Sequence, residues 1–311
     1  MKISGIVSEE CIKCEECIKE CPARLFFKKE QTGDTKEAKE ICYADPNNLC
    51  ILCGHCLAVC PTNAVKAEEI EGLYEFPEAK DPTEILSYEN LIKELRARRS
   101  IRRFQARPIP QDQIELVLQA MRYAPSASNA QNWNYIVITD SEKIQFFSKQ
   151  VMKIFYLLKK VLKFKQIIRL FVSGATKQLL LDPKTTISIK RHISEFEAGR
   201  DVIFYNAPCV ILIHSPEYGS MAGVDAGIAF TYGMLAAQSL GLGTCWIGFA
   251  QEAVKRDGKL KKWLQIPKGR NCYGVMVMGY PAVKFQRVPP RKELTVQWLL
   301  NSRHDYGKEN L

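Results

Sequence analysis

The chain has 311 residues, of which 46% are hydrophobic and 25% charged, a composition typical of soluble globular proteins with two domains. It contains no uncharged apolar segment long enough to span a membrane and no secretory signal, so we expect a cytoplasmic protein with reduced thiols. The net charge is +10, but residues 1–80 carry −5 and the rest carries +15, which suggests internal docking or an acidic partner. No recognisable nucleic-acid-binding motif accompanies the positive charge, so we expect no nucleic-acid partner.

Eight of the twelve cysteines form two runs near the N-terminal end. Each run has the spacing C-x2-C-x2-C-x3-C followed by proline, the signature of bacterial 4Fe–4S proteins. Three thiolates of one tight loop reach three corners of a cubane cluster, and the fourth corner is bound by the other run. The spacing therefore predicts two 4Fe–4S clusters, the first held by Cys11, Cys14, Cys17 and Cys60 and the second by Cys21, Cys50, Cys53 and Cys56.

Two other uses of these thiols compete with this interpretation. Paired C-x2-C motifs also suit zinc, but zinc gives no reason for the proline after each fourth cysteine. A disulfide framework needs an oxidising compartment, which nothing in the sequence indicates. Residues 1–68 resemble the bacterial two-cluster ferredoxins, although the spacer at 22–49 is long and charged and contains an additional thiol, Cys42, which we expect to be a spare.

The middle of the chain begins with a linker and a basic turn. Residues 69–87 are rich in proline and acidic residues and are predicted to be the linker. Ser87 is a suitable N-cap for a helix with apolar side chains at Leu91 and Leu95. The helix runs into R-R-S-I-R-R at 98–103, which fits either a solvated turn or an anion site, since arginine presents a planar fork to phosphate.

A second amphipathic helix is predicted over 111–123, where apolar residues recur at helical spacing. It ends before a loop rich in hydroxyl and amide side chains, residues 124–133, and an apolar strand follows at 135–139. Such a loop can bind a polar planar ligand, or it can be only a polar turn.

The remainder of the chain alternates helices with apolar strands. Residues 143–181 carry nine lysines and arginines and no acidic residue, interleaved with aromatic and aliphatic side chains, and are predicted to form one or two basic amphipathic helices. Three isolated cysteines are interpreted as small buried hydrophobes, namely Cys209, Cys245 and Cys272. The other predicted elements are strands at 209–214 and 273–278 and helices at 225–240 and 254–263.

Four motifs, in this order, resemble the FMN-dependent nitroreductase family. They are R-R-S-I-R at 98–102, A-P-S-A-S-N-A-Q-N-W at 124–133, G-L-G-T-C-W-I-G at 241–248 and I-P-K-G with V-M-G-Y-P between 266 and 281. The resemblance implies an α+β fold, an α/β sandwich that forms a homodimer with one FMN in each of two interface sites, and it assigns residues 88–311 to the FMN-binding domain. No Rossmann fingerprint competes for the flavin, because the glycine pair at 241 and 243 follows a helix.

The resemblance also assigns roles to residues. Arg98 and Ser100 would hold the FMN phosphate, and Arg102 would reach the pyrimidine edge of the ring. The residues expected from the second subunit are Pro125, Ser126, Ala127 and Asn129. Further cofactor-binding residues are Arg99, Gln131, Trp246, Ile247, Gly248 and Arg291, of which Ile247 and Gly248 would place backbone groups near the flavin N5. The acidic residue that the family often has beside N5 is missing, which leaves the substrate preference open.

Together these features predict an oxidoreductase that passes electrons from a low-potential donor through the two clusters to FMN. The flavin would then reduce a nitroaromatic, a quinone or an activated alkene, so no acid–base dyad is expected. We expect an acidic ferredoxin or flavodoxin as donor. Residues 143–181 would be a lid over the flavin, a docking face for the donor or, least favoured, a membrane-surface helix. Two alternatives remain: an electron-transfer or redox-sensing module without organic turnover, and an NAD(P)H-dependent reductase with the clusters as exit.

Overall fold

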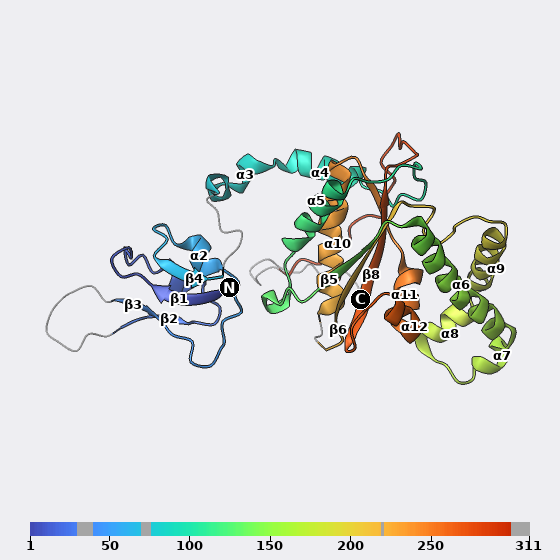
Figure 1. The fold of residues 1–311 in the computed structure, drawn as a ribbon, viewed down its shortest axis with the longest axis horizontal. Helices are drawn as coiled ribbons and strands as arrows, with labels where there is room; N and C mark the ends of the chain where they lie inside the picture. The colour runs from blue at the N-terminus through green and yellow to red at the C-terminus, as the bar shows by residue number, and fades with distance from the viewer. Residues whose placement is uncertain (30–39, 70–75, 219–220, 300–311) are drawn as a thin grey trace, which may run out of the picture.

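The computed structural model describes residues 1–29, 40–69, 76–218 and 221–299. Part of the predicted linker, residues 70–75, and the end of the predicted FMN-binding domain, residues 300–311, lie outside them. Figure 1 shows a small N-terminal module at one end of the molecule and a larger body of sheet and helices at the other. Among the described residues, no helix combines the length and the apolar character needed to span a bilayer.

The N-terminal module consists of two similar halves. Its elements are β1 (Lys2–Ile6), α1 (Glu16–Glu20), β2 (Phe26–Lys28), β3 (Ile41–Tyr43), α2 (His55–Val59) and β4 (Val65–Glu68). Strand β1 pairs antiparallel with β4, β2 pairs antiparallel with β3, and the two short helices contact each other. Each helix follows a residue in the left-handed conformation, Glu15 in one half and Gly54 in the other, so the two cysteine runs fold alike.

The buried core of the module is small. Among the described residues, one cluster of seven buried side chains forms it, and two of them are thiols: Ile3, Cys17, Phe26, Ile41, Cys56, Leu57 and Val65. A domain of this size buries little apolar surface and is marginally stable, so we expect ligands bound by its thiols to add to its stability.

The body is built around a four-stranded antiparallel sheet. Its strands are β5 (Asn134–Ile138), β6 (Cys209–Pro216), β7 (Gly243–Trp246) and β8 (Arg270–Gly279), in the order β5-β6-β8-β7. The two central strands, β6 and β8, are almost entirely buried. Strands β5 and β7 form the two opposite edges of the sheet, so segments attached to one edge lie far from segments attached to the other.

Helices cover both faces of the sheet and make an α/β sandwich, as predicted. One face packs against α5 (Gln111–Arg122) and α10 (Ala222–Ser239), and the other packs against α6 (Ser141–Lys163), α9 (Pro183–Glu197), α11 (Gly248–Arg256) and α12 (Gly258–Trp263). Because side chains alternate along a strand, Ile211 and Ile213 of β6 enter the first core, while Val210 and Leu212 enter the second.

The connection between module and body contains short helices and one longer helix. They are the 3-10 helix η1 (Pro77–Lys80), α3 (Pro82–Ile85) and α4 (Tyr88–Ala97). The predicted N-cap of α4 is confirmed, because the Ser87 hydroxyl accepts a hydrogen bond of 3.3 Å from the backbone N–H of Asn90. The single helix predicted at 254–263 is wrong. Asp257 breaks it, because its extended backbone ends α11 and its carboxylate caps α12 by accepting from two backbone N–H groups.

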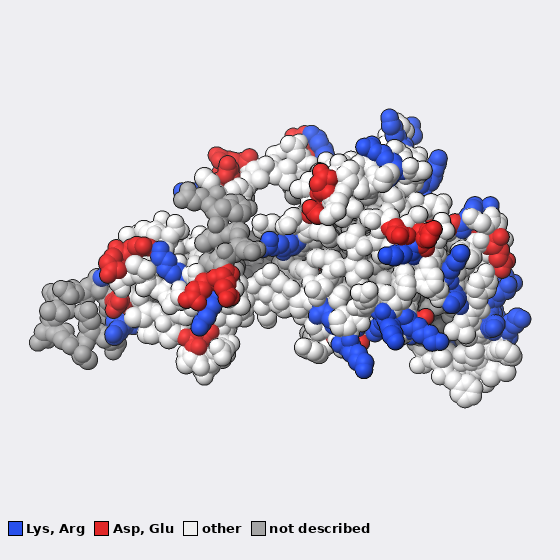
Figure 2. Space-filling model, in the orientation of Figure 1, with Lys and Arg blue, Asp and Glu red and all other residues white. Residues whose placement is uncertain are grey.

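An arm of helices α6 to α9 forms the end of the molecule remote from the module (Figure 1). It includes α7 (Lys165–Ile168) and α8 (Gly174–Leu181). The predicted basic segment 143–181 is only partly a surface feature, because Phe147, Val151 and Phe155 of α6 are buried in the core. Beyond them the arm exposes Phe171, which is 83% accessible, and basic side chains gather on this end of the body in Figure 2.

Candidate functional site

Two cavities in the module each gather four cysteines. The first cluster cavity is lined by Cys11, Cys14, Cys17 and Cys60. The second cluster cavity is lined by Cys21, Cys50, Cys53 and Cys56. Four thiols are the ligand number of a 4Fe–4S cluster, so the residues present fit that group. The reciprocal ligand assignment stays a prediction, and this grouping supports it.

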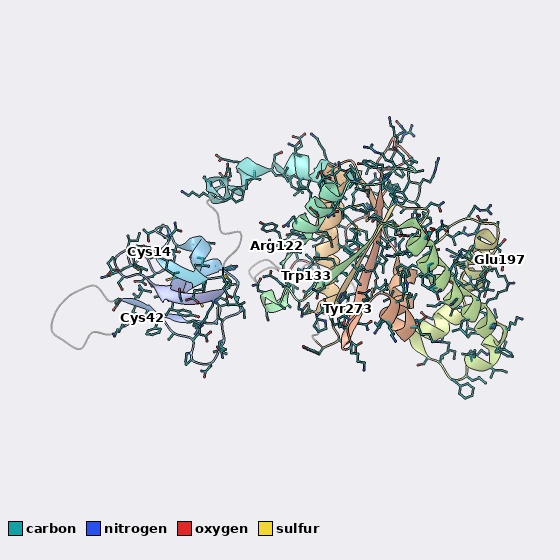
Figure 3. All side chains as sticks on the ribbon, viewed as in Figure 1. Cys14, Cys42, Arg122, Trp133, Glu197 and Tyr273 are labelled. Atoms are coloured by element: carbon teal, nitrogen blue, oxygen red, sulfur yellow. The ribbon has the colours of Figure 1, made fainter. Side chains whose placement is uncertain are left out.

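The spacing of the thiols differs from that of a site for one metal ion. Within residues 1–29, 40–69, 76–218 and 221–299, no group of three or more His, Cys, Asp or Glu side chains is arranged to hold a single ion. A zinc site would place four sulfurs about 2.3 Å from one centre. Cys42 is not among the residues that line either cavity. Figure 3 labels it in the module together with Cys14.

Backbone N–H groups donate to Cys21 and Cys60, the cysteines that each run contributes to the cavity of the other run. The N–H of Leu25 donates to Cys21 Sγ over 3.4 Å, and the N–H of Ala64 donates to Cys60 Sγ over 3.2 Å. Burial acts to raise the pKa of the Cys60 thiol, but backbone N–H groups outweigh it and lower the pKa overall. Burial and the neighbouring thiols raise the pKa of Cys56 to about 11, so a thiolate there needs a cationic partner such as cluster iron.

The basic stretch after α4 lies along edge strand β7. The N–H of Ile101 donates to the Thr244 oxygen over 2.9 Å, and Ser100 forms an isolated bridge with Thr244. The side chain of Ile101 is buried against Gly243, where an added Cβ would lie 2.4 Å from Ile101 Cγ1. The stretch can approach the strand this closely because residue 243 is glycine.

Three predicted flavin residues meet beside this strand, and we call Arg98, Ser100 and Arg102 the arginine group. All three act on the Cys245 thiol: burial raises its pKa, whereas Arg102, Ser100 and Arg98 act to lower it. The Arg102 guanidinium also lies 6.0 Å from the ring centre of Tyr205. Two guanidinium groups and a hydroxyl are suitable donors for a phosphate or an anionic ring, so this group fits FMN. Sequence analysis did not place Cys245 here.

The next predicted flavin residues continue directly from β7. Trp246 packs edge-on against Phe230 with ring centres 4.9 Å apart, and its Nε1 donates to Gln251 over 2.9 Å. The N–H of Ile247 donates to the Val275 oxygen over 2.7 Å, which fixes the strand end. Helix α11 then begins at Gly248, where an added Cβ would meet nothing within 4 Å, so this side of the chain is open.

Two other predicted contacts are placed differently. Arg99 donates to the main-chain oxygens of Arg98, over 2.6 Å, and of Arg96, and its Nη2 donates to the Arg287 oxygen over 3.4 Å. Arg99 therefore closes the turn after α4. Arg291 is exposed on the segment that follows β8, and no hydrogen bond or ion pair among the described residues joins it to the arginine group.

The predicted loop at 124–133, called the polar loop below, lies at the other edge of the sheet, before β5. It contains Pro125 and the 3-10 helix η2 (Ala127–Asn129). The N–H of Ala127 donates to the buried Asp225 over 3.1 Å, and the N–H of Gln131 donates to Ser126 Oγ over 3.0 Å. Non-glycine residues with positive φ concentrate here, with 51° at Ser128 and Asn129 and 42° at Gln131. Such backbone persists only where contacts hold it, and it is typical of functional loops.

Within one chain the polar loop and the arginine group do not meet. They belong to opposite edges, three strand spacings or about 14 Å apart. Helix α10 gives the same separation. Its Asp225 holds the loop near one end, and its Gln238 donates to the Glu94 oxygen over 3.0 Å near the other end, about 20 Å away along the helix.

An aromatic group beside Gly248 was not predicted. Phe249 is 51% exposed and packs edge-on against Phe155 of α6, with ring centres 4.8 Å apart. His192 of α9 stacks on Phe155 at 5.1 Å, and its Nδ1 lies 2.7 Å from the Ser188 oxygen. Because a carbonyl oxygen can only accept, Nδ1 is the donor in that contact. The arm thus places a ring wall next to the end of β7.

Comparison with known proteins finds a family for each of the two parts of the chain. Residues 95–280, more than half of the chain, match the nitroreductase family, and residues 10–64 match the 4Fe-4S dicluster domain. A putative NADH dehydrogenase/NAD(P)H nitroreductase of Archaeoglobus fulgidus is 27% identical over 62% of this chain and 86% of its own. A ferredoxin of Rickettsia felis is 31% identical over 28% of this chain and 73% of its own. A solved nitroreductase with bound FMN from Bacteroides fragilis superposes with a TM-score of 0.48 and 21% identity, covering 67% of this chain and 98% of that one.

Proposed function

The chain belongs to the nitroreductase family and carries a 4Fe–4S dicluster domain at its N-terminal end, and we propose that it is an iron–sulfur flavoprotein that reduces a small organic acceptor. The observation that carries the proposal is the arginine group on the β7 edge, in the same chain as two cavities of four thiols each. When bound, the clusters supply single electrons and FMN supplies the two-electron reduction of the acceptor.

The residues of the body have separate tasks toward FMN. Arg98 and Ser100 would hold the phosphate through charge-assisted hydrogen bonds. Arg102 would place positive charge at the pyrimidine edge and so favour the ring when it carries negative charge. The main chain at Ile247 and Gly248 would lie beside the reacting edge. The ring wall of Phe249, Phe155 and His192 would exclude water from it.

A homodimer completes the flavin site in this proposal. The polar loop and the arginine group lie at opposite edges of one chain, so each site would take one of them from each copy. Apolar side chains outside the sandwich support such an association: Leu91 and Leu95 of α4 are exposed, and Leu294 and Trp298 after β8 are 92% and 72% exposed. Exposed apolar surface of this kind marks protein–protein interfaces.

The donor is proposed to be a small acidic one-electron carrier, a ferredoxin or flavodoxin. Two-cluster modules handle single electrons, and the exposed Cys14 at the first cluster cavity gives a donor a place of approach. The arm lies at the far end of the body within one chain, so it suits a lid over the flavin better than a docking face for the module's donor. The name of the archaeal relative points to NAD(P)H instead, which makes that donor the competing outcome of the test.

The acceptor is proposed to be a flat, electron-poor molecule: a nitroaromatic, a quinone or an activated alkene. The main-chain side at Gly248 is open, and the neighbouring ring of Phe249 is half-exposed, so a planar molecule can stack there.

Anaerobic reduction of the purified protein tests the proposal. Analysis should first find about eight iron atoms and one FMN per chain. Stopped-flow absorbance with reduced ferredoxin, NADH and NADPH should then show fastest flavin bleaching with ferredoxin and consumption of an added quinone or nitroaromatic. Zinc at the cysteines, or no retained flavin, would contradict the cofactor assignment. Faster bleaching with NAD(P)H than with ferredoxin would reverse the proposed direction of electron flow.

A further inference from the structure

A side-chain amide joins the module to the body. Asn129 Nδ2 donates to the main-chain oxygen of Leu52 over 2.8 Å and to that of Ile51 over 3.2 Å. Both oxygens belong to the turn between Cys50 and Cys53, which lines the second cluster cavity. Figure 3 shows the labelled Arg122 and Trp133 on the side of the body that faces the module. The second cluster cavity is therefore the one adjacent to the body.

The polar loop holds the Asn129 amide in a fixed orientation. Gln131 Nε2 donates to Asn129 Oδ1 over 2.8 Å, which leaves Nδ2 to face the module. The loop itself is tied to the body through Ala127 and the buried Asp225. An amide supported in this way acts as a rigid clamp between the loop and the cysteine turn.

The same polar loop is the half of the flavin site that each copy gives to the other in the proposed dimer. The loop lies at the β5 edge, and the arginine group of its own chain lies at the opposite edge. A module clamped to the loop is consequently clamped next to the flavin held by the arginine group of a second copy.

We propose that electrons cross between subunits: the second cluster is the exit, and it serves the FMN held by the arginine group of the other copy. The inference rests on the proposed function, because it needs both FMN and the dimer. Asn129 is then a positioning residue that holds the exit turn against the flavin site. The first cluster, with the exposed Cys14, is the entrance.

The transfer is a one-electron step taken twice. Each time the module loses one electron, and a one-electron reductant such as a reduced ferredoxin restores it. One proton from solvent accompanies the electron pair to the flavin, and the reduced ring keeps one negative charge that faces Arg102, so charge and atoms balance. No bond to a protein atom forms or breaks.

Mixed dimers distinguish transfer between subunits from transfer within one. One lesion, Cys53→Ser, removes the exit cluster, and the other, Arg98→Ala with Arg102→Ala, removes flavin retention. In the split dimer each subunit carries one lesion; in the combined dimer one subunit carries both and its partner carries none. Two affinity tags purify each dimer after co-expression. Both dimers contain the same iron and flavin, which analysis verifies, and only the arrangement differs.

Flavin bleaching by reduced ferredoxin in a single stopped-flow turnover gives the answer. The split dimer should bleach at the wild-type rate with half of the wild-type amplitude. The combined dimer should bleach about tenfold more slowly or worse, like a homodimer of the Cys53→Ser variant. The reverse pattern, or equal rates in the two dimers, would overturn the inference. A wild-type protein that retains no FMN would overturn the proposed function itself, and flavin analysis detects this before any rate is measured.

Asn129→Asp tests the positioning role without a change at any cysteine. A carboxylate cannot donate, and it repels the two main-chain oxygens that the amide now contacts. Hydrogen exchange of the amides at 50–53 should accelerate severalfold in the apo-flavin protein, and single-turnover bleaching should slow. Asn48→Asp, the same change at an exposed module residue, is the control. Unchanged exchange at 50–53 in the Asn129 variant would show that the clamp is not formed.

Discussion

The module and the body build their interiors in different ways. In the part of the module that the structure describes, the buried core cluster has seven residues, two of which are cluster-cavity thiols. The body has two extensive apolar cores with fully buried aromatic side chains such as Phe147, Phe204 and Phe230. A small domain gains folding free energy from bound metal, whereas a large sandwich folds on apolar burial. The comparison predicts that cofactor binding and folding are coupled in the module and separate in the body.

The largest expected effect follows from this difference. Removing iron with a chelator under anaerobic conditions should unfold the module, because its thiols then lack their shared partner. Hydrogen exchange should become complete in β1 and β4, while the amides of β6 and β8 stay protected. Removing FMN should leave both regions folded. If β1 and β4 stay protected from hydrogen exchange after iron removal, the module does not need bound metal to fold.

Pairs of cysteine substitutions test whether each cysteine run supplies one ligand to the cluster of the other run. Cys60→Ala with Cys11→Ala should lose about four iron atoms per chain, no more than either change alone, because both residues line the first cluster cavity. Cys60→Ala with Cys50→Ala should lose about eight. Cys42→Ser, outside both cavity linings, is the control and should lose none. Iron analysis of the purified variants decides between these outcomes.

In the body, a single methyl group should affect both packing and the flavin site. Gly243→Ala forces its Cβ against Ile101, which should cost about 1–3 kcal/mol of unfolding free energy and displace the arginine group. FMN retention should fall along with stability. Gly258→Ala, where an added Cβ meets nothing within 4 Å, is the matched control. Denaturant unfolding and flavin titration measure the two effects, and a stable variant with normal FMN affinity would contradict the proposed approach of the stretch to β7.

The charge of Arg102 should set the potential of the flavin without affecting the fold. Arg102→Ala should lower the two-electron potential by about 20–60 mV, equivalent to about 1–3 kcal/mol, because the ring loses a nearby positive charge in its reduced state. Arg98→Ala should instead weaken FMN retention. Arg103→Ala, at an exposed neighbouring position, should do neither. Spectroelectrochemical titration provides the measurement, and an unchanged potential with FMN bound would remove Arg102 from the site.

The last effect concerns the pH dependence of the body. Burial, with a further contribution from Arg270, lowers the pKa of His214 to about 4. The unfolded chain takes up a proton below about pH 6.5 while the folded chain does not, so stability is present above that pH and is lost on acidification. The loss between pH 7 and pH 5 should be about 2 kcal/mol. In a His214→Gln variant, the free energy of unfolding should lose this part of its pH dependence. If the free energy of unfolding changes equally with pH in the variant and the wild type, His214 does not cause the effect.

Local features of the fold were predictable because local rules determine them. The cap at Ser87 and the helical spacing that gave α5 both act within a few residues. The break at Asp257 was missed because an aspartate inside a lysine-rich helical pattern resembles an exposed helix position until its carboxylate is seen to cap α12. Strand β7 was missed because it is only four residues long.

The candidate site likewise contains residues that the sequence identified and residues that only the tertiary structure brings to it. Cys245 resembled an isolated buried thiol in the sequence, and His192 had no recognisable spacing to any other functional residue. Both acquire neighbours only when β7 and the arm pack against distant segments. Asn129 was predicted to line the flavin, and its contact with the turn at Ile51 and Leu52 could not be anticipated, because it joins two regions through main-chain atoms that carry no sequence signal.

The sequence by itself determined which residue types could bind the cofactors, because the cysteine spacing and the arginine stretch act over short distances along the chain. Only the tertiary structure decided where those residues lie. The order β5-β6-β8-β7 places the polar loop and the arginine group at opposite edges, and strand order is set by long-range packing rather than by any local pattern. That order separates the two halves of the predicted flavin site, and the Asn129 contact brings the second cluster cavity to one of them.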